Sequence, residues 1–303
     1  MNIHARPFMA ALIYIILSNL IISCSNDNSN EQEDDLYVQI PDLNFESKLI
    51  SLGIDSEGIT DQRLLKTDAL KVEDLDLNSF GKDEISDLTG IEGFKNLTKL
   101  QAEGNSLTTV DLSSNKQLDT LILSGNFIKT IDLSNNTALI KLNLSVNELS
   151  SVSGLENAIN LKWLSLSYNV LEEFSIQTTA LESLFIRDNL LTSLDIQNAE
   201  SLITLLAQTN RISEIDLTTN TALETLALSD NRIQSVNLEA NPEIETLYIS
   251  SNSLLSLDIS NLEKLVFLTV DRNPDLSCIK IETGQTVPNL TMSEYQELNT
   301  DCN

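Results

Sequence analysis

The feature that most constrains this chain is a motif of about 21 residues that recurs throughout its middle part. Each copy opens with the pattern L-x-x-L-x-L-x-x-N, as in "LDTLILSGN" at 118–126. The asparagines that close the pattern are Asn105, Asn126, Asn147, Asn169, Asn189, Asn210, Asn231, Asn252 and Asn273. One unit cannot bury its own leucines, so the repeat predicts a solenoid in which neighbouring units stack.

Each unit has two halves, and both predict extended chain. In the first half, leucines alternate with variable residues, which is the period of a short strand with one buried face. The strand leucines are Leu100, Leu121, Leu142, Leu164, Leu184, Leu205, Leu226, Leu247 and Leu268, and a less regular copy holds Leu75 and Leu77. The second half, such as "IKTIDLSNN" at 128–136, also alternates and leaves little room for a helix. About ten units therefore span residues 71–276.

The recurring asparagine has a physical reason at the turn after each strand. Backbone N–H and C=O groups lose their ladder partners where the chain turns. A buried side-chain amide can satisfy both kinds of group, because it donates and accepts. We therefore expect each asparagine to be buried and to bond the backbone of its turn.

These repeats resemble the leucine-rich repeat family in its 21-residue bacterial form, in which the second half is itself a degenerate LxxLDLxxN. The resemblance implies an α/β solenoid with a parallel β-sheet on the concave face and a mostly extended convex side. The units "EISDLTGIEGFKNLTKLQAEGN" (84–105) and "SSVSGLENAINLKWLSLSYN" (150–169) lack the "LDLS" half and look like the internalin-type repeat. The shape of their convex segments stays open.

The first residues have the character of an export signal. Arg6 precedes an apolar run over residues 8–23 that is shorter than the roughly 20 residues of a membrane span. The following "LIISC" resembles a bacterial lipobox, which implies cleavage after residue 23 and lipidation of Cys24. The acidic stretch 25–35 cannot pack, so residues 24–36 are expected to form a flexible tether. It resembles the export signal of Bacteroidetes surface lipoproteins. An ordinary signal peptide and a periplasmic location are the alternatives.

Residues 37–70 are expected to cover the first leucine layer as a helical cap. Asp42 is placed to cap a helix, and Phe45, Leu49 and Leu52 share one helical face. Gly53 is placed to end the helix, and the block resembles the leader of leucine-rich repeat proteins from flavobacteria. The "DSEGITD" fragment at 55–61 lacks full calcium-loop spacing, so a solvated turn is predicted there rather than a metal site.

Residues 277–303 are expected to form the opposite cap. Cys278 and Cys302 are the only cysteines besides Cys24. In an exported protein, two cysteines that flank a terminal segment most simply form a disulfide, and the segment resembles the cysteine-bearing cap of the family. Such a bridge would stabilise the fold by roughly 3 kcal/mol on the chain-entropy model. Free thiols are the alternative.

The charge and the missing residue types exclude several function classes. The chain carries 18 Lys and Arg against 45 Asp and Glu, a net charge of −27, which disfavours nucleic acid or an anionic membrane as the main partner. The single histidine, His4, lies in the signal, so His-dependent catalysis and His-ligated zinc are not expected. No cofactor or metal is predicted. The recurring aspartates Asp111, Asp132, Asp195, Asp216 and Asp258 are interpreted as a solvated edge rather than a calcium ladder.

The residues that alternate with the strand leucines should form the outer surface of the sheet. Most of them are Ser, Thr and Asn, so large apolar and aromatic side chains stand out. The candidate ligand-binding residues are Trp163, Tyr168, Phe185, Arg187, Leu206, Tyr248 and Phe267. Aromatic residues with Arg are typical of interface hot spots, whereas scattered exposed apolar residues need no function.

The sequence thus predicts a monomeric, non-enzymatic protein-binding module with a lipid anchor at the outer membrane, facing the cell exterior. A glycan-binding lipoprotein that captures polysaccharide is the alternative, because sugars could stack on Trp163 and Tyr248. An envelope-structure protein whose concave face binds nothing is a third possibility, and an enzyme is the least favoured.

Overall fold

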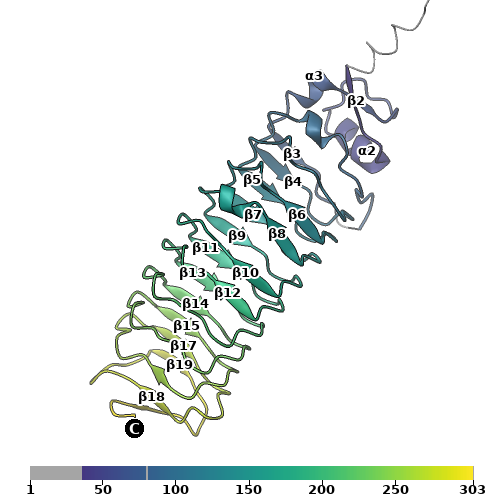
Figure 1. Ribbon diagram of the computed structural model, residues 1–303. Coiled ribbons are helices and arrows are strands. Elements are labelled where there is room, and N and C mark those ends of the chain that lie inside the picture. Colours follow the sequence, from purple (N-terminus) through teal and green to yellow (C-terminus); the bar gives the residue numbers. More distant parts are fainter. Residues whose placement is uncertain (1–35, 80, 303) are drawn as a thin grey trace, which may run out of the picture. The chain divides into compact units, whose positions relative to one another are not determined.

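The strand leucines of successive repeats stack in register and build one parallel sheet. The computed structural model describes residues 36–79 and 81–302. Eleven strands follow one another side by side in chain order (Figure 1). They are β3 (Asp74–Asp76), β4 (Lys99–Gln101), β5 (Thr120–Ile122), β7 (Lys141–Asn143), β9 (Trp163–Ser165), β11 (Ser183–Phe185), β13 (Thr204–Leu206), β14 (Thr225–Ala227), β15 (Thr246–Tyr248), β17 (Phe267–Thr269) and β19 (Asn289–Thr291). The predicted parallel-sheet solenoid is confirmed.

The middle residue of each strand forms the inner leucine layer. Leu184, Leu205 and Leu226 occupy equivalent positions on adjacent strands and are fully buried. The residues on either side of them point outward as two columns, in the register that the sequence predicted. We call this outer surface of the eleven strands, together with the turns that follow them, the sheet face.

The second halves of the repeats are mostly extended, as predicted. Short parallel pairs form between β6 (Thr130–Asp132) and β8 (Ser151–Ser153), and between β10 (Glu173–Ser175) and β12 (Ser193–Asp195). The two irregular repeats differ from the rest, because each contains a 3₁₀ helix: η1 (Ile91–Gly93) and η2 (Leu155–Asn157). A glycine with positive φ precedes each of these helices, Gly90 in the first and Gly154 in the second.

The repeated asparagines bond the turns as predicted, but the expectation that each is buried was wrong for Asn210 and Asn231, which are partly exposed. Asn126 is typical: its Nδ2 donates to the carbonyl oxygens of Ala102 (2.9 Å) and Leu123 (3.0 Å), and its Oδ1 accepts from the amide of Leu107 (3.0 Å). Each amide therefore joins two adjacent turns. This dense bonding matters because buried backbone groups without partners are costly.

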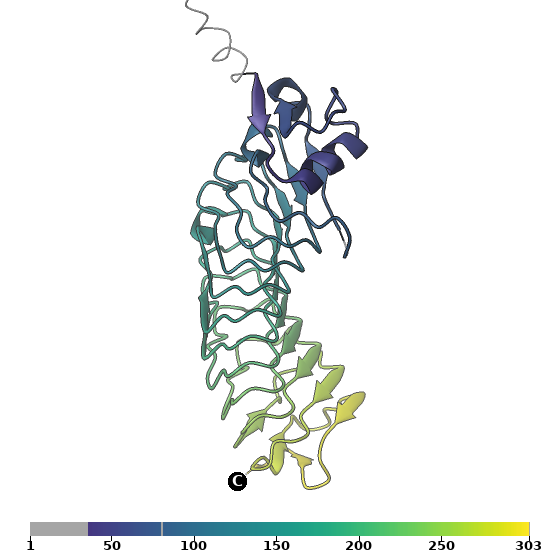
Figure 2. The same ribbon diagram turned by 90° about the vertical axis from the view of Figure 1, so that its right-hand side faces the viewer.

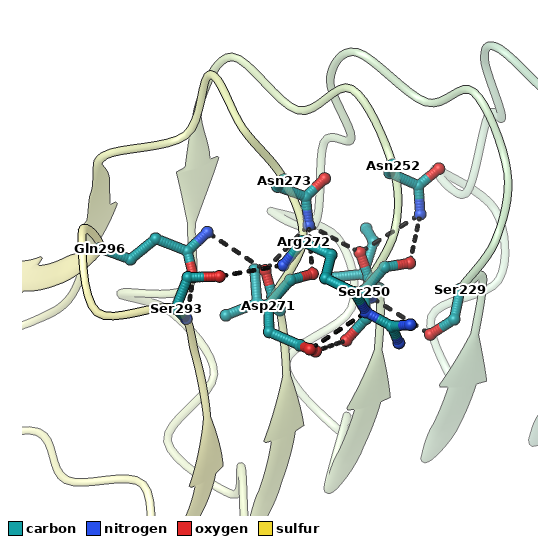
Figure 3. A network of polar contacts seen from close by, with 10 residues as sticks. Ser229, Ser250, Asn252, Asp271, Arg272, Asn273, Ser293 and Gln296 are labelled. Carbon is teal, nitrogen blue, oxygen red and sulfur yellow. Dashed lines mark hydrogen bonds and ion pairs between the residues drawn. The ribbon is translucent and has the colours of Figure 1, made fainter.

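The asparagine ladder ends on a glutamine at the C-terminal end of the sheet. Figure 3 shows Gln296 beside Asn273, the last asparagine of the series. Gln296 is 4% exposed, and its Nε2 donates to the carbonyl oxygen of Val270 at 3.2 Å, the same oxygen that Asn273 bonds at 2.9 Å. Its Oε1 accepts from the amide of Ser293 at 2.7 Å. The longer side chain thus satisfies the backbone where the repeat pattern stops.

The N-terminal segment covers the first leucine layer with two helices and a pair of antiparallel strands (Figure 2). It contains β1 (Tyr37–Gln39), α2 (Leu43–Ser51), β2 (Arg63–Leu65) and α3 (Lys66–Ala69), and β1 pairs antiparallel with β2. Sequence reasoning expected the helix but missed the strand pair. The ring of Phe45, on α2, lies 6.4 Å from the ring of Phe94 in the first repeats. This contact joins the cap to the solenoid.

Helix α2 begins and ends as predicted, with one correction. Asp42 caps it by accepting hydrogen bonds from the amides of Asn44 and Phe45, and Gly53 follows it with φ +68°. Phe45 and Leu49 are buried, but Leu52 is 45% exposed, so its expected place on the buried face was wrong. The helix stops at Ser51, and the chain turns at Leu52 before that side chain reaches the core.

Asp42 also bonds the first repeat, which gives a pH-dependent contribution to stability. Its second carboxylate oxygen accepts from the amides of Ser86 (2.8 Å) and Asp87 (3.1 Å) and from the Ser86 hydroxyl. Burial opposes the charge, but these hydrogen bonds and that of Phe45 outweigh it and lower the pKa of Asp42 below 3.8. A carboxylate with a depressed folded-state pKa stabilises above its unfolded pKa, and this contribution is lost as the pH falls through the folded value.

We therefore predict that Asp42→Asn costs about 1 kcal/mol at pH 7, because the amide keeps one accepting oxygen for the cap but loses the charged second oxygen that accepts from Ser86 and Asp87. The difference from wild type should vanish below the folded-state pKa, because the protonated wild-type carboxyl then resembles the amide. Urea unfolding of both proteins between pH 7 and pH 2.5 measures this. A difference that stays constant across this range would contradict the prediction.

The C-terminal segment extends the stack and is closed by a disulfide. Strand β19 adds the eleventh strand of the sheet, while β18 (Cys278–Lys280) pairs with β16 (Leu257–Asp258) and with β20 (Glu297–Asn299). Cys278 is bonded to Cys302, with Cα atoms 5.7 Å apart. The predicted disulfide cap is confirmed.

Candidate functional site

Three of the predicted ligand-binding residues lie on consecutive strands of the sheet face. Trp163 begins β9, Phe185 ends β11 and Leu206 ends β13, and these strands are direct neighbours. Phe185 is paired in register with Leu206, and the rings of Trp163 and Phe185 are 5.1 Å apart with a tilt of 40°. All three side chains are partly exposed. They form a continuous apolar surface, which we call the central patch.

Lys141 adds a cation to the central patch. It lies on β7, paired in register with Trp163, and its Nζ is 5.0 Å from the centroid of the Trp163 ring. Such a contact over an aromatic face is a cation–π interaction. Lys141 was not among the residues that the sequence predicted for the site. The sequence could have indicated Lys141, because it occupies the same outward column as Trp163, one repeat earlier.

Tyr168 and Arg187 form a second pair at the turn beside the central patch. Tyr168 follows β9, has a positive φ of 59° and is 44% exposed. The guanidinium carbon of Arg187, which follows β11, is 4.9 Å from the Tyr168 ring centroid. These two candidate residues are therefore in contact with each other.

A valine with a strained backbone lies in the turn next to Tyr168. Val146 occupies the equivalent turn position one repeat before Tyr168, and its amide donates to the carbonyl oxygen of Ser167 at 2.9 Å. Its φ of 56° is unusual for a β-branched residue and costs about 1–2 kcal/mol. It is also 53% exposed. Gly104 and Gly125 hold this position in earlier repeats, so valine replaces a residue type that adopts this conformation without strain.

Tyr248 and Phe267 stand further along the sheet face. Only Ala227 on β14 separates Tyr248 on β15 from Leu206, so a column of apolar residues runs from β11 to β15. Phe267 on β17 is 44% exposed and pairs in register with Thr246 and Asn289. Its ring makes no aromatic contact with Tyr248 within the described residues. The structure thus joins Tyr248 to the central patch more closely than it joins Phe267.

Most charged groups near the sheet face are already paired. Near the C-terminal end, the Ser250 hydroxyl donates to Asp271, and Arg272 Nε donates to the other Asp271 oxygen at 3.1 Å (Figure 3). Lys99, in the same column as Lys141, is 3.1 Å from Asp74. By contrast, Lys141 has no carboxylate within ion-pair distance in the part of the chain that the structure describes.

The recurring aspartates of the second half-repeats act as turn-forming residues. Asp111, Asp132, Asp216 and Asp258 each accept a hydrogen bond from the amide two residues later, as Asp132 does from Ser134 at 2.9 Å. The Ser134 hydroxyl and amide hold the pKa of Asp132 below its ordinary value. Within residues 36–79 and 81–302, no cluster of three or more His, Cys, Asp or Glu side chains could hold a metal ion. These carboxylates are engaged locally.

Two further observations bear on the kind of site. A hollow lined by Val152, Phe174 and Ser175 lies on the second set of strands, away from the central patch.

Of the helices within the described ranges, none has the length and apolar character that crossing a membrane requires. His4, Cys24 and the rest of the expected signal and tether, up to residue 35, lie outside the described residues.

Comparison with solved structures identifies the fold. The functional domain of InlJ from Listeria monocytogenes is 22% identical, with a TM-score of 0.51 over 86% of this chain and 72% of that one. The leucine-rich repeat domain of APL1B is 24% identical, with a TM-score of 0.60 over 76% and 82%. A chain of the LRIM1/APL1C complex is 25% identical, with a TM-score of 0.59 over 77% of this chain and 47% of that one.

These similarities show a leucine-rich repeat fold, and the class of protein is a parallel-sheet solenoid. No protein-family model matches the chain, and no curated protein matches it. The function must therefore be argued from the chemistry of the sheet face.

Proposed function

We propose that this protein is a non-enzymatic binding module that holds a protein ligand on its sheet face. The observation that carries the proposal is the central patch, in which Trp163, Phe185 and Leu206 are contiguous on three adjacent strands. Large aromatic side chains in contact with one another and rimmed by Ser and Thr have the composition of an interface hot spot. The similarity to a chain of the LRIM1/APL1C complex, a protein assembly with this fold, supports a protein ligand.

The geometry of the aromatic rings favours protein over glycan. A sugar ring binds an aromatic side chain by laying its C–H groups against an open face. Lys141 lies over the Trp163 ring, Phe185 packs beside it, and Arg187 lies over Tyr168. Peptide side chains can pack around such a surface without needing a free ring face. At Trp163 and Tyr168, glycan capture is therefore the weaker of the two candidates.

Truncation of the central patch tests the proposal. Partners captured by the full chain from a surface-protein extract are identified, and their affinities are then measured with purified proteins. Trp163→Ala and Phe185→Ala should each weaken binding by about 2 kcal/mol or more, roughly 30-fold, as expected for hot-spot aromatics. Tyr295→Ala is the matched control, because Tyr295 is 51% exposed and lies outside the central patch. Wild-type affinity of both patch variants for every partner would overturn the proposal.

We further propose that the module is anchored by lipid on Cys24 and faces the cell exterior at the outer membrane. The support is the apolar run ending in "IISC" followed by the acidic stretch 25–35. Metabolic labelling with a fatty-acid probe should mark the wild type and not Cys24→Ser. Equal labelling of both, or of neither, would contradict the anchor. Protease shaving of intact cells tests the surface location separately, because a periplasmic protein would stay intact.

A further inference from the structure

An unpaired lysine beside the central patch indicates the chemistry of the ligand. Lys141 is exposed, and its ammonium group lies 5.0 Å from the Trp163 ring centroid without a carboxylate partner in the described residues. We propose that the bound protein segment carries a carboxylate that pairs with Lys141, next to an apolar side chain that packs on Trp163 and Phe185. This inference rests on the proposed function and names the kind of segment that the site takes.

Ligand binding at the central patch would change the surroundings of Lys141. A ligand that covers Trp163 also removes water from the ammonium group above it, because the two groups are in contact. Burying an unpaired charge is costly, and contact with an aromatic ring offsets only part of the loss. A carboxylate on the ligand removes this cost. An apolar ligand without one would have to bury the ammonium unpaired or displace it from the ring.

Lys99 is a lysine on the same sheet face that does have a carboxylate partner. It occupies the same column of the sheet two strands away, and its Nζ lies 3.1 Å from Asp74. The chain has 45 acidic residues, yet none of the described ones pairs with Lys141. The residues paired in register with Lys141 are Thr120 and Trp163. Neither of these residues can supply a counter-ion to Lys141.

Arg187 provides a second cation for the same ligand. Its guanidinium lies over Tyr168, and its Nε is 3.8 Å from Asp188, which is longer than a normal hydrogen bond. Arg187 therefore keeps donors for a second carboxylate. Lys141 lies over the first residue of β9 and Arg187 lies over the turn that follows this strand. An apolar segment with acidic residues on both sides matches this arrangement.

The overall negative charge of the chain does not exclude an acidic ligand. Electrostatic interactions between exposed charges are largely screened beyond about 8 Å at physiological ionic strength. The contacts of a carboxylate with Lys141 and Arg187 are shorter than this. The net charge of −27 instead opposes long-range approach, so affinities of different ligands must be compared at one ionic strength.

The experiment uses Trp163, the only tryptophan, as its reporter. The full chain is titrated with three synthetic peptides that share a Leu-Phe centre and carry two Glu, two Gln or two Lys on each side. The Glu peptide should bind about tenfold more tightly than the Gln peptide, and the Lys peptide most weakly. Lys141→Gln should remove most of this preference, and Lys99→Gln should keep it. Lys141→Glu should make the Lys peptide bind more tightly than the Glu peptide.

The outcomes separate the inference from the proposed function. If the Glu and Gln peptides bind equally and both lose binding to Trp163→Ala, the inference of a ligand carboxylate is wrong. The proposal of protein binding at the central patch is then retained. If no peptide changes the Trp163 emission but oligogalacturonate does, the ligand is an acidic glycan and the inference is wrong. If neither acts and the patch variants also capture partners normally, both proposals fail. An unchanged preference in Lys141→Gln likewise overturns the role of Lys141.

Discussion

Leu205→Ala should lower the free energy of unfolding by about 2–5 kcal/mol. Leu205 is fully buried in the leucine layer between Leu184 and Leu226. Truncation leaves a cavity that the stacked neighbours cannot fill, because each is held by its own turn. In a solenoid, stability is a sum of repeat and nearest-neighbour terms. The damage should therefore centre on repeats around β11, β13 and β14, where amide exchange should become faster.

The adjacent residue provides the control for this prediction. Leu206 has the same side chain on the same strand but is partly exposed on the sheet face. Leu206→Ala should cost at most about 1 kcal/mol, because little buried volume is lost. Urea unfolding followed by circular dichroism compares the two variants. If Leu206→Ala proved the more damaging, the assignment of inward and outward residues on β13 would be reversed.

The repeat made most of this fold predictable. Leucines two residues apart can all be buried only if the chain is extended, and a 21-residue spacing leaves stacking as the way to cover them. The asparagines were predictable for a similar reason, since Asn126 and its equivalents occupy positions where the backbone needs both a donor and an acceptor. Leu52 was misplaced, because helical periodicity does not reveal the residue at which α2 ends.

The site was predictable only in outline. The outward columns follow from alternation, so the proximity of Trp163, Phe185 and Leu206 could be derived from register. The direction of the Lys141 side chain could not, because a long side chain on an exposed column can lean toward either neighbour. The positive φ of Val146 was also hidden, since local propensity argues against a β-branched residue there. Both features depend on contacts between repeats.

The irregular repeat at 150–169 departs from the regular pattern because its second half turns sharply before η2. Gly154 makes this turn with φ +83° and lies close against the preceding repeat. A Cβ at this position would meet the Ser134 amide nitrogen at 2.1 Å and the Ser134 Cα at 2.5 Å. Backbone atoms of a stacked turn cannot move aside without disturbing their own hydrogen bonds. The glycine is therefore required both for its conformation and for its lack of a side chain.

Gly154→Ala should accordingly destabilise the protein by at least about 3 kcal/mol, because left-handed strain and displacement of the adjacent turn add together. Gly284→Ala separates the two causes. Gly284 has nearly the same φ, +84°, but a Cβ there would meet nothing within 4 Å, so only the conformational cost of about 1–2 kcal/mol should remain. Urea unfolding of both variants measures the difference. Equal losses would mean that the close approach of Gly154 to Ser134 contributes nothing to stability, and that the turn before η2 requires only a left-handed residue.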